Sequence, residues 1–152
     1  EKKILPTLKS RCLTFKISLT FNQSINVVNQ LLNKNILEEI NTDIINYYIT
    51  PGEIVNLINF ADEKKINLLD YDLFGLLNLL INNGYYKKNK NIKNIIITFI
   101  ELFFLKEYKL RNTKNSLLVF YHNFLDKIHN TEKFNLDEES LFLEFKSKIL
   151  DE

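Results

Sequence analysis

Glycine and proline are scarce in this chain, which has three glycines and two prolines in 152 residues. These two residues mark the tight turns on which β-rich folds depend, so their scarcity favours helices joined by short connections. Apolar residues also recur at helical spacing over most of the length. The sequence therefore predicts a mainly all-α fold, in one domain or two small ones, able to bury roughly 70% of the unfolded surface.

Several segments have the apolar spacing of helices, and two carry clear end signals. Thr50 is placed to cap a helix that begins at Pro51, with Glu53 in the first turn, where an acidic side chain is favoured. Asn83-Gly84 predicts a left-handed helix end. The segments predicted to be helical are approximately residues 22–32, 37–47, 51–61, 71–81, 92–108, 116–129 and 139–149, the last preceded by a capping-box pattern at 135–138.

Two of these segments also predict which side chains are buried. The first has its apolar face on Phe21, Ile25, Val28, Leu31 and Leu32. The segment 71–81 is apolar nearly all round, which predicts a helix covered on most sides.

Residues 13–17 differ from the rest because they alternate apolar and polar side chains of β-favouring types, which predicts a short strand. A single strand needs a sheet, and the remaining sequence supplies none. We therefore expect the chain to be the C-terminal part of a longer protein, an expectation that the missing initiator methionine fits. A shift in composition at 67–71 divides the rest into a three-helix unit, 18–68, and a more hydrophobic helical bundle, 69–152.

Charge and composition narrow the function classes. The net charge of +1 implies no strong overall attraction to nucleic acid or to an anionic membrane. A single cysteine leaves no internal disulfide and fits a reducing compartment. The longest apolar run, 95–105, is interrupted by Thr98 and Glu101 and is too short to span a membrane. With no signal peptide visible, we expect a cytoplasmic location and no membrane partner.

The sequence offers no constellation of metal-ligating or catalytic residues. His122 and His129 are seven residues apart on one predicted helix, about 10 Å along its axis, which is too far for one ion without further ligands. Cys12 and Ser10 have no histidine near them in the sequence. No glycine-rich phosphate loop is present. We expect no metal site and no independent catalysis.

Lys87, Lys88 and Lys90 form a basic cluster that Tyr85 and Tyr86 precede. Basic residues beside aromatic ones are typical of surfaces that contact a nucleic-acid backbone. An exposed connector between helices fits the same pattern, and the near-neutral net charge favours it. Both interpretations remain open from the sequence.

Arg11 is one of only two arginines among 20 basic residues. Where lysine is the usual cation, an arginine indicates a need for its planar, two-pronged guanidinium group. Arg11 lies between Ser10 and Cys12, in the stretch from Leu5 that reads Leu-Pro-Thr-Leu-Lys-Ser-Arg-Cys.

This stretch resembles the Ser-Arg-Cys motif of bacterial DNA polymerase III clamp-loader subunits, which belong to the AAA+ ATPases. The segment Thr50-Pro51-Gly52-Glu53 resembles the element that opens the last lid helix in subunits of the delta-prime type. The resemblance implies that residues 1–17 end an AAA+ nucleotide-binding domain, that 18–68 form a three-helix lid, and that 69–152 form a helical collar for oligomerisation.

The resemblance also implies a role for Arg11. As an arginine finger it would reach into the ATP site of a neighbouring subunit, while this chain binds no cofactor itself. The implied partners are other clamp-loader subunits and, through the complex, the sliding clamp and primer–template DNA. Many AAA+ proteins have an arginine where this chain has Glu53, which fits a subunit that does not hydrolyse ATP. A helical adaptor unrelated to replication and a direct nucleic-acid binder are the alternatives.

Overall fold

The computed structural model describes residues 18–45, 49–87, 89–110, 115–134 and 139–151. Within these ranges every regular element is helical, which confirms the mainly all-α prediction, and the predicted strand at 13–17 and capping box at 135–138 lie outside them. The elements are α2 (Phe21–Leu32), the 3-10 turn η1 (Ile36–Glu38), α3 (Pro51–Lys64), α4 (Leu73–Asn82), the 3-10 turn η2 (Tyr85–Lys87), α5 (Lys90–Leu110), α6 (Asn115–Phe134), α7 (Glu139–Phe145) and its π-helical continuation η3 (Lys146–Leu150).

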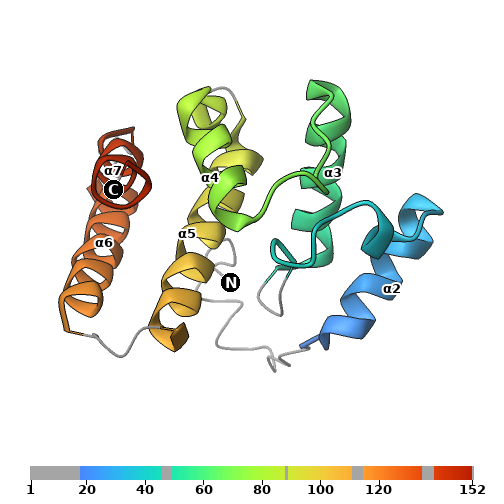
Figure 1. Cartoon of the computed structure of the whole chain (residues 1–152), viewed down its shortest axis with the longest axis horizontal. Helices are drawn as coiled ribbons and strands as arrows, with labels where there is room; N and C mark the ends of the chain where they lie inside the picture. Colours follow the sequence, from blue (N-terminus) through green and yellow to red (C-terminus); the bar gives the residue numbers. More distant parts are fainter. Residues whose placement is uncertain (1–17, 46–48, 88, 111–114, 135–138, 152) are drawn as a thin grey trace, which may run out of the picture.

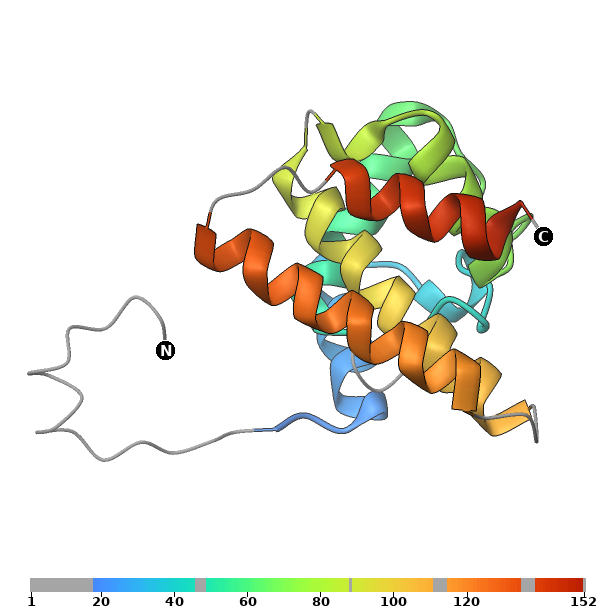
Figure 2. The same cartoon turned by 90° about the vertical axis from the view of Figure 1, so that its left-hand side faces the viewer.

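The long helix α5 is the central element of the molecule. It packs against α3, α4 and α6, while α2 packs on α3, and α7 on α6. The order from right to left in Figure 1 is therefore α2, α3, the pair α4 and α5, and the pair α6 and α7. Seen from the side in Figure 2, α6 runs across α5 with α7 above it.

The buried apolar side chains form one continuous cluster from α2 to η3. Its C-terminal part is an aromatic group around Phe104 of α5, which is 3% exposed. The ring of Phe104 lies 4.9 Å from that of Tyr121 and 6.2 Å from that of Phe124, both in α6, and 5.8 Å from that of Phe145 in α7. The segments on either side of the predicted boundary at 67–71 thus share a core, and the division into domains stays a prediction.

The prediction of a helix over residues 37–47 is wrong in the part that the structure describes. Only the single turn η1 forms, and the chain then continues in turns. The side chain of Asn41 accepts a hydrogen bond from the backbone N–H of Asp43 at 3.0 Å, and the backbone N–H of Asn41 donates to the carbonyl of Leu68 at 3.3 Å. These bonds replace those that a helix would need, because an asparagine side chain competes for nearby backbone groups.

The end signals read from the sequence are confirmed at α3 and after α4. The Thr50 hydroxyl accepts the N–H of Glu53, and the Glu53 carboxylate accepts the N–H of Thr50, so the two residues form a capping box. Gly84, after α4, has a φ of +61°, in the left-handed region. The inward assignment of Leu31 is wrong, because its side chain is 64% exposed.

Candidate functional site

The stretch that carries the resemblance lies outside the described residues. Ser10, Arg11 and Cys12 belong to residues 1–17, so the structure gives no geometry for the arginine expected to act on a neighbour's ATP. The described part of the chain begins with Ser18, just ahead of α2. What the structure adds concerns the elements that follow this stretch, beginning with the N-terminus of α3.

Glu53, the acidic residue at the start of α3, is held by three hydrogen bonds. One carboxylate oxygen accepts from the N–H and the hydroxyl of Thr50, each at 2.8 Å. The other lies 3.2 Å from the hydroxyl of Thr98 in α5. A helix N-terminus would otherwise attract an anion such as phosphate, but here the protein's own carboxylate occupies that position. Glu53 also links the start of α3 to the middle of α5.

The side chain of Asp43 links its own segment to α4 and to α5. One carboxylate oxygen accepts the backbone N–H of Leu73, the first residue of α4, at 3.0 Å, and the other binds the ammonium group of Lys106 in α5. Burial alone would raise the pKa of Asp43, but the hydrogen bonds from Lys106 and Leu73, with the positive charge of Lys106, hold it below its usual value. The sequence pattern did not indicate this joint, because its members are 30 and 63 residues from Asp43.

Of the basic cluster, the structure describes Lys87 and Lys90. The Lys87 ammonium lies 2.5 Å from a carboxylate oxygen of Glu139 in α7 and 5.9 Å from the ring centre of Tyr86. Lys87 is therefore engaged with the protein itself. Lys90 begins α5 and is exposed, and Lys88 lies outside the described residues. A nucleic-acid contact at these lysines stays a prediction.

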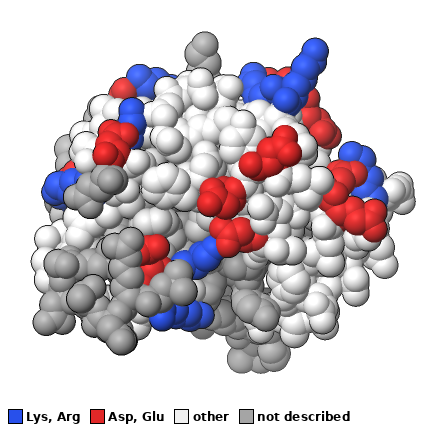
Figure 3. Space-filling view, viewed as in Figure 1, with Lys and Arg blue, Asp and Glu red and all other residues white. Residues whose placement is uncertain are grey.

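Charged side chains on the face drawn in Figure 3 are unevenly distributed. Acidic groups gather near the middle of the face, whereas the lysines are scattered and form no continuous basic patch on it. His122 and His129 both lie on α6 and are exposed. Within the described ranges no three His, Cys, Asp or Glu side chains are grouped so as to hold a metal ion. None of the described helices is both long and apolar enough to cross a membrane.

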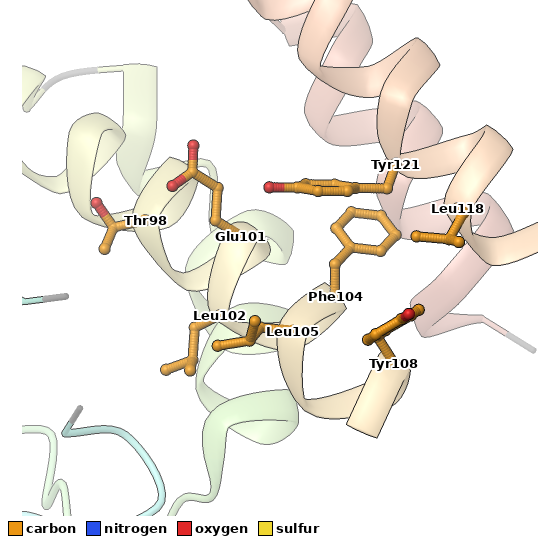
Figure 4. Close-up of a pocket in the computed structure, with 8 residues that line it drawn as sticks. All are labelled: Thr98, Glu101, Leu102, Phe104, Leu105, Tyr108, Leu118 and Tyr121. Atoms are coloured by element: carbon orange, nitrogen blue, oxygen red, sulfur yellow. The ribbon is translucent and has the colours of Figure 1, made fainter. Parts of the chain in front are cut away.

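A cavity of about 320 Å³ lies between α5 and α6 (Figure 4). Its lining is mostly hydrocarbon and aromatic. The side chains that line it come from six positions on α5 and two on α6: Thr98, Glu101, Leu102, Phe104, Leu105, Tyr108, Leu118 and Tyr121.

Three polar side chains of the cavity, Thr98, Glu101 and Tyr121, lie toward one end, whereas the hydroxyl of Tyr108 lies toward the other. Figure 4 shows the hydroxyl of Tyr121 pointing toward the side chain of Glu101, whose carboxylate is turned away from the ring, with Thr98 one turn before Glu101. Partial burial, with the negative charge of Glu53 nearby, raises the pKa of Glu101 above its usual value. Burial, with the charge of Glu101, likewise raises the pKa of Tyr121. Apolar walls with a few convergent polar groups are typical of small-ligand sites.

The sequence contains a signal for this cavity that lies outside any recognised motif. Thr98 and Glu101 are the two polar residues that interrupt the apolar run 95–105. A charged residue inside such a run must reach solvent, find a partner or face a cavity, because burying an unpaired charge is costly. Glu101 lines the cavity and is exposed, so its charge also reaches solvent. The contribution of α6 could not be read from the run itself.

Comparisons with known protein families, with curated proteins and with solved structures each find no match for this chain.

Proposed function

We propose that this chain is the C-terminal part of a clamp-loader subunit of bacterial DNA polymerase III, of the delta-prime type. The observation that carries the proposal is the stretch from Leu5 to Cys12, with its Ser-Arg-Cys motif. It is followed by a mainly helical chain in which Thr50-Pro51-Gly52-Glu53 opens a helix. In this proposal residues 1–17 end an AAA+ domain, 18–68 are the lid and 69–152 are the collar. The protein would help to load the sliding clamp onto primer–template DNA.

The environment of Glu53 supports a subunit that completes another subunit's active site. Its carboxylate is bound to Thr50 and Thr98 at the helix N-terminus where a subunit that senses its own nucleotide would need a cation. A phosphate at this position would meet a negative charge. The chain would therefore hydrolyse no ATP alone, and it would supply Arg11 to the ATP of a neighbour.

The chemistry expected of Arg11 is stabilisation of charge during phosphoryl transfer. A guanidinium group donated by a neighbouring subunit pairs with the transferred phosphoryl oxygens through two parallel hydrogen bonds. Such arginine fingers increase the rate roughly 10³–10⁵-fold in the best-studied GTPases. The ammonium group of lysine has no planar fork, so Arg11→Lys should replace it poorly.

The test uses the full-length protein assembled with its loader partners, the sliding clamp and primed DNA. Arg11→Ala should leave assembly intact, as judged by size-exclusion chromatography, and should sharply lower the DNA-stimulated ATPase rate. Arg111→Ala removes the only other arginine of the chain and is the matched control, for which normal turnover is expected. An Arg11→Ala complex with normal turnover would overturn the arginine-finger assignment.

A helical adaptor unrelated to replication is the second candidate, and exposed apolar side chains favour it. Leu31, Val119 and Phe134 are 64%, 59% and 60% exposed, which is more than these residue types usually show. Such side chains suit contact with another protein. Failure of the full-length protein to join the loader subunits in a purified mixture would favour the adaptor over the loader.

A further inference from the structure

The cavity between α5 and α6 has the size and lining of a site for a small organic molecule. Its volume of about 320 Å³ is at the lower end of the range for such sites, roughly 300–1,000 Å³. Leu102, Leu105 and Leu118 supply hydrocarbon on both helices. A ligand that fits would have a small apolar body.

The polar end of the cavity specifies the charge of the ligand. Glu101 has no hydrogen bond or ion pair with any residue that the structure describes. Glu53, close enough to raise the pKa of Glu101, has hydrogen bonds only to Thr50 and Thr98, which are both neutral. Glu101 therefore lines the cavity, and Glu53 lies near it outside the lining, with neither carboxylate paired to a cation of the described residues.

Three oxygen-bearing groups can accept hydrogen bonds from a ligand at this end. They are the Glu101 carboxylate and the hydroxyls of Tyr121 and Thr98, whose residues all line the cavity. An alkylammonium group carries three N–H donors and no acceptor, so it matches this set. A carboxylate or phosphate ligand would instead be repelled by Glu101 and Glu53.

From this geometry we propose that the α5–α6 cavity binds a small primary amine with an apolar body. The ammonium group lies at Glu101 and Tyr121, and the hydrocarbon part lies among the three leucines. Binding of an amine in this cavity is independent of the proposed role of Arg11, because the cavity forms within one chain and needs no assembly into a clamp loader. The chain alone is therefore enough for the test.

The test compares two probes of nearly equal shape, 4-phenylbutylamine and the uncharged 4-phenylbutanol. Each is titrated into the whole chain and followed by NMR. The amine should bind about tenfold more tightly or better, because hydrogen bonds to a charged group are the stronger ones. Equal binding of the two probes, or no binding of the amine, would overturn the proposal.

Substitutions of lining residues test whether the amine binds in the α5–α6 cavity. Glu101→Gln should remove the preference for the amine, and Tyr121→Phe should reduce it, while binding of the alcohol stays unchanged in both. Asp126→Asn removes an exposed acidic group of α6 and should leave the preference intact. Leu118→Phe should weaken the binding of both probes, because the larger side chain fills the cavity. Circular dichroism checks that this variant keeps its fold. A preference for the amine that survives Glu101→Gln would place the binding elsewhere and defeat the proposal.

A last experiment distinguishes a small free amine from a lysine-containing protein segment as the ligand. The capped tripeptide acetyl-Leu-Lys-Leu-amide presents the same ammonium group on a peptide. It should bind no more tightly than 4-phenylbutylamine, because the cavity has room for a small ligand only. If the peptide bound more than tenfold more tightly, the assignment to a small amine would be wrong.

Discussion

Asp43 joins parts of the chain that are distant in sequence, since its partners Leu73 and Lys106 are 30 and 63 residues away. Asp43→Ala removes the bond to the N–H of Leu73 and leaves Lys106 without its partner. Both charged side chains are about one third exposed, so we expect a loss of about 1–2 kcal/mol in the free energy of unfolding. Urea denaturation of the variant and the native chain measures this loss of stability.

The matched control for Asp43 is Asp62→Ala, on the exposed face of α3. That variant should unfold at nearly the same urea concentration as the native chain, because surface substitutions usually change stability little. The double variant Asp43→Ala/Lys106→Ala should lose less than the sum of the two single variants. Additive losses would show that the ion pair contributes nothing.

Glu101 predicts a pH dependence with a definite sign. Its pKa is raised in the folded chain by partial burial and by Glu53, so ionisation of Glu101 opposes folding. Glu101→Gln should therefore raise the melting temperature at pH 7, and the difference from the native chain should shrink as the pH falls through the raised pKa. Melting curves between pH 4 and 8 test this. A difference that grows toward acid would show that the carboxylate is stabilised instead.

At the scale of elements, two glycines should respond to alanine in opposite directions. Gly84 has a φ of +61°, so an alanine there adopts a strained backbone and should cost roughly 1–2 kcal/mol, although its Cβ would meet only the Lys87 side chain at an ordinary 3.5 Å. Gly52 lies in the first turn of α3 with nothing within 4 Å of a new Cβ. Gly52→Ala should therefore stabilise the chain by about 0.4–1 kcal/mol.

Thermal or urea unfolding of these two variants measures both effects. The two substitutions add the same methyl group, so a difference in sign isolates the backbone conformation. If Gly84→Ala were neutral, the turn after α4 would tolerate another conformation, and the left-handed cap would be unimportant for stability.

Elements with local end signals were the ones that the sequence predicted well. The start of α3 depends on Thr50, Pro51 and Glu53, which are adjacent in the chain, so their meaning could be read without the fold. Residues 37–47 have isoleucines at helical spacing, yet the bonds of Asn41 to Asp43 and Leu68 prevent a helix in the described part. Spacing indicates which side chains are buried, and it does not show which backbone groups bond to one another.

The whole molecule should unfold in one cooperative step. The buried side chains of α2 to η3 form one cluster, α3 packs on α5, and Asp43 and Glu53 add polar links across the predicted boundary. We expect the calorimetric and van 't Hoff enthalpies to agree. Two transitions would show instead that the units at 18–68 and 69–152 are independent in stability.

The arrangement of the helices could not be predicted from the sequence. Apolar spacing identified the burial of α4 on most sides, and five of its side chains are buried, although Phe74 is 40% exposed. It did not show that α5 would meet α3, α4 and α6, because any apolar face can cover any other. The cavity beside Glu101 depends on α5 and α6 together, so no single segment of sequence could reveal its shape.

The joint at Asp43 also has a consequence for how such chains can diverge. The Asp43 carboxylate accepts hydrogen bonds from two donors. The backbone N–H at position 73 is present in every residue except proline, whereas the ammonium group at position 106 requires a lysine. Substitutions should therefore be tolerated differently at positions 43 and 106. Descendants of this chain should lose the lysine first, with asparagine or serine then tolerated at position 43 as an acceptor for Leu73, whereas a lineage that loses the acid first would keep a lysine with no partner.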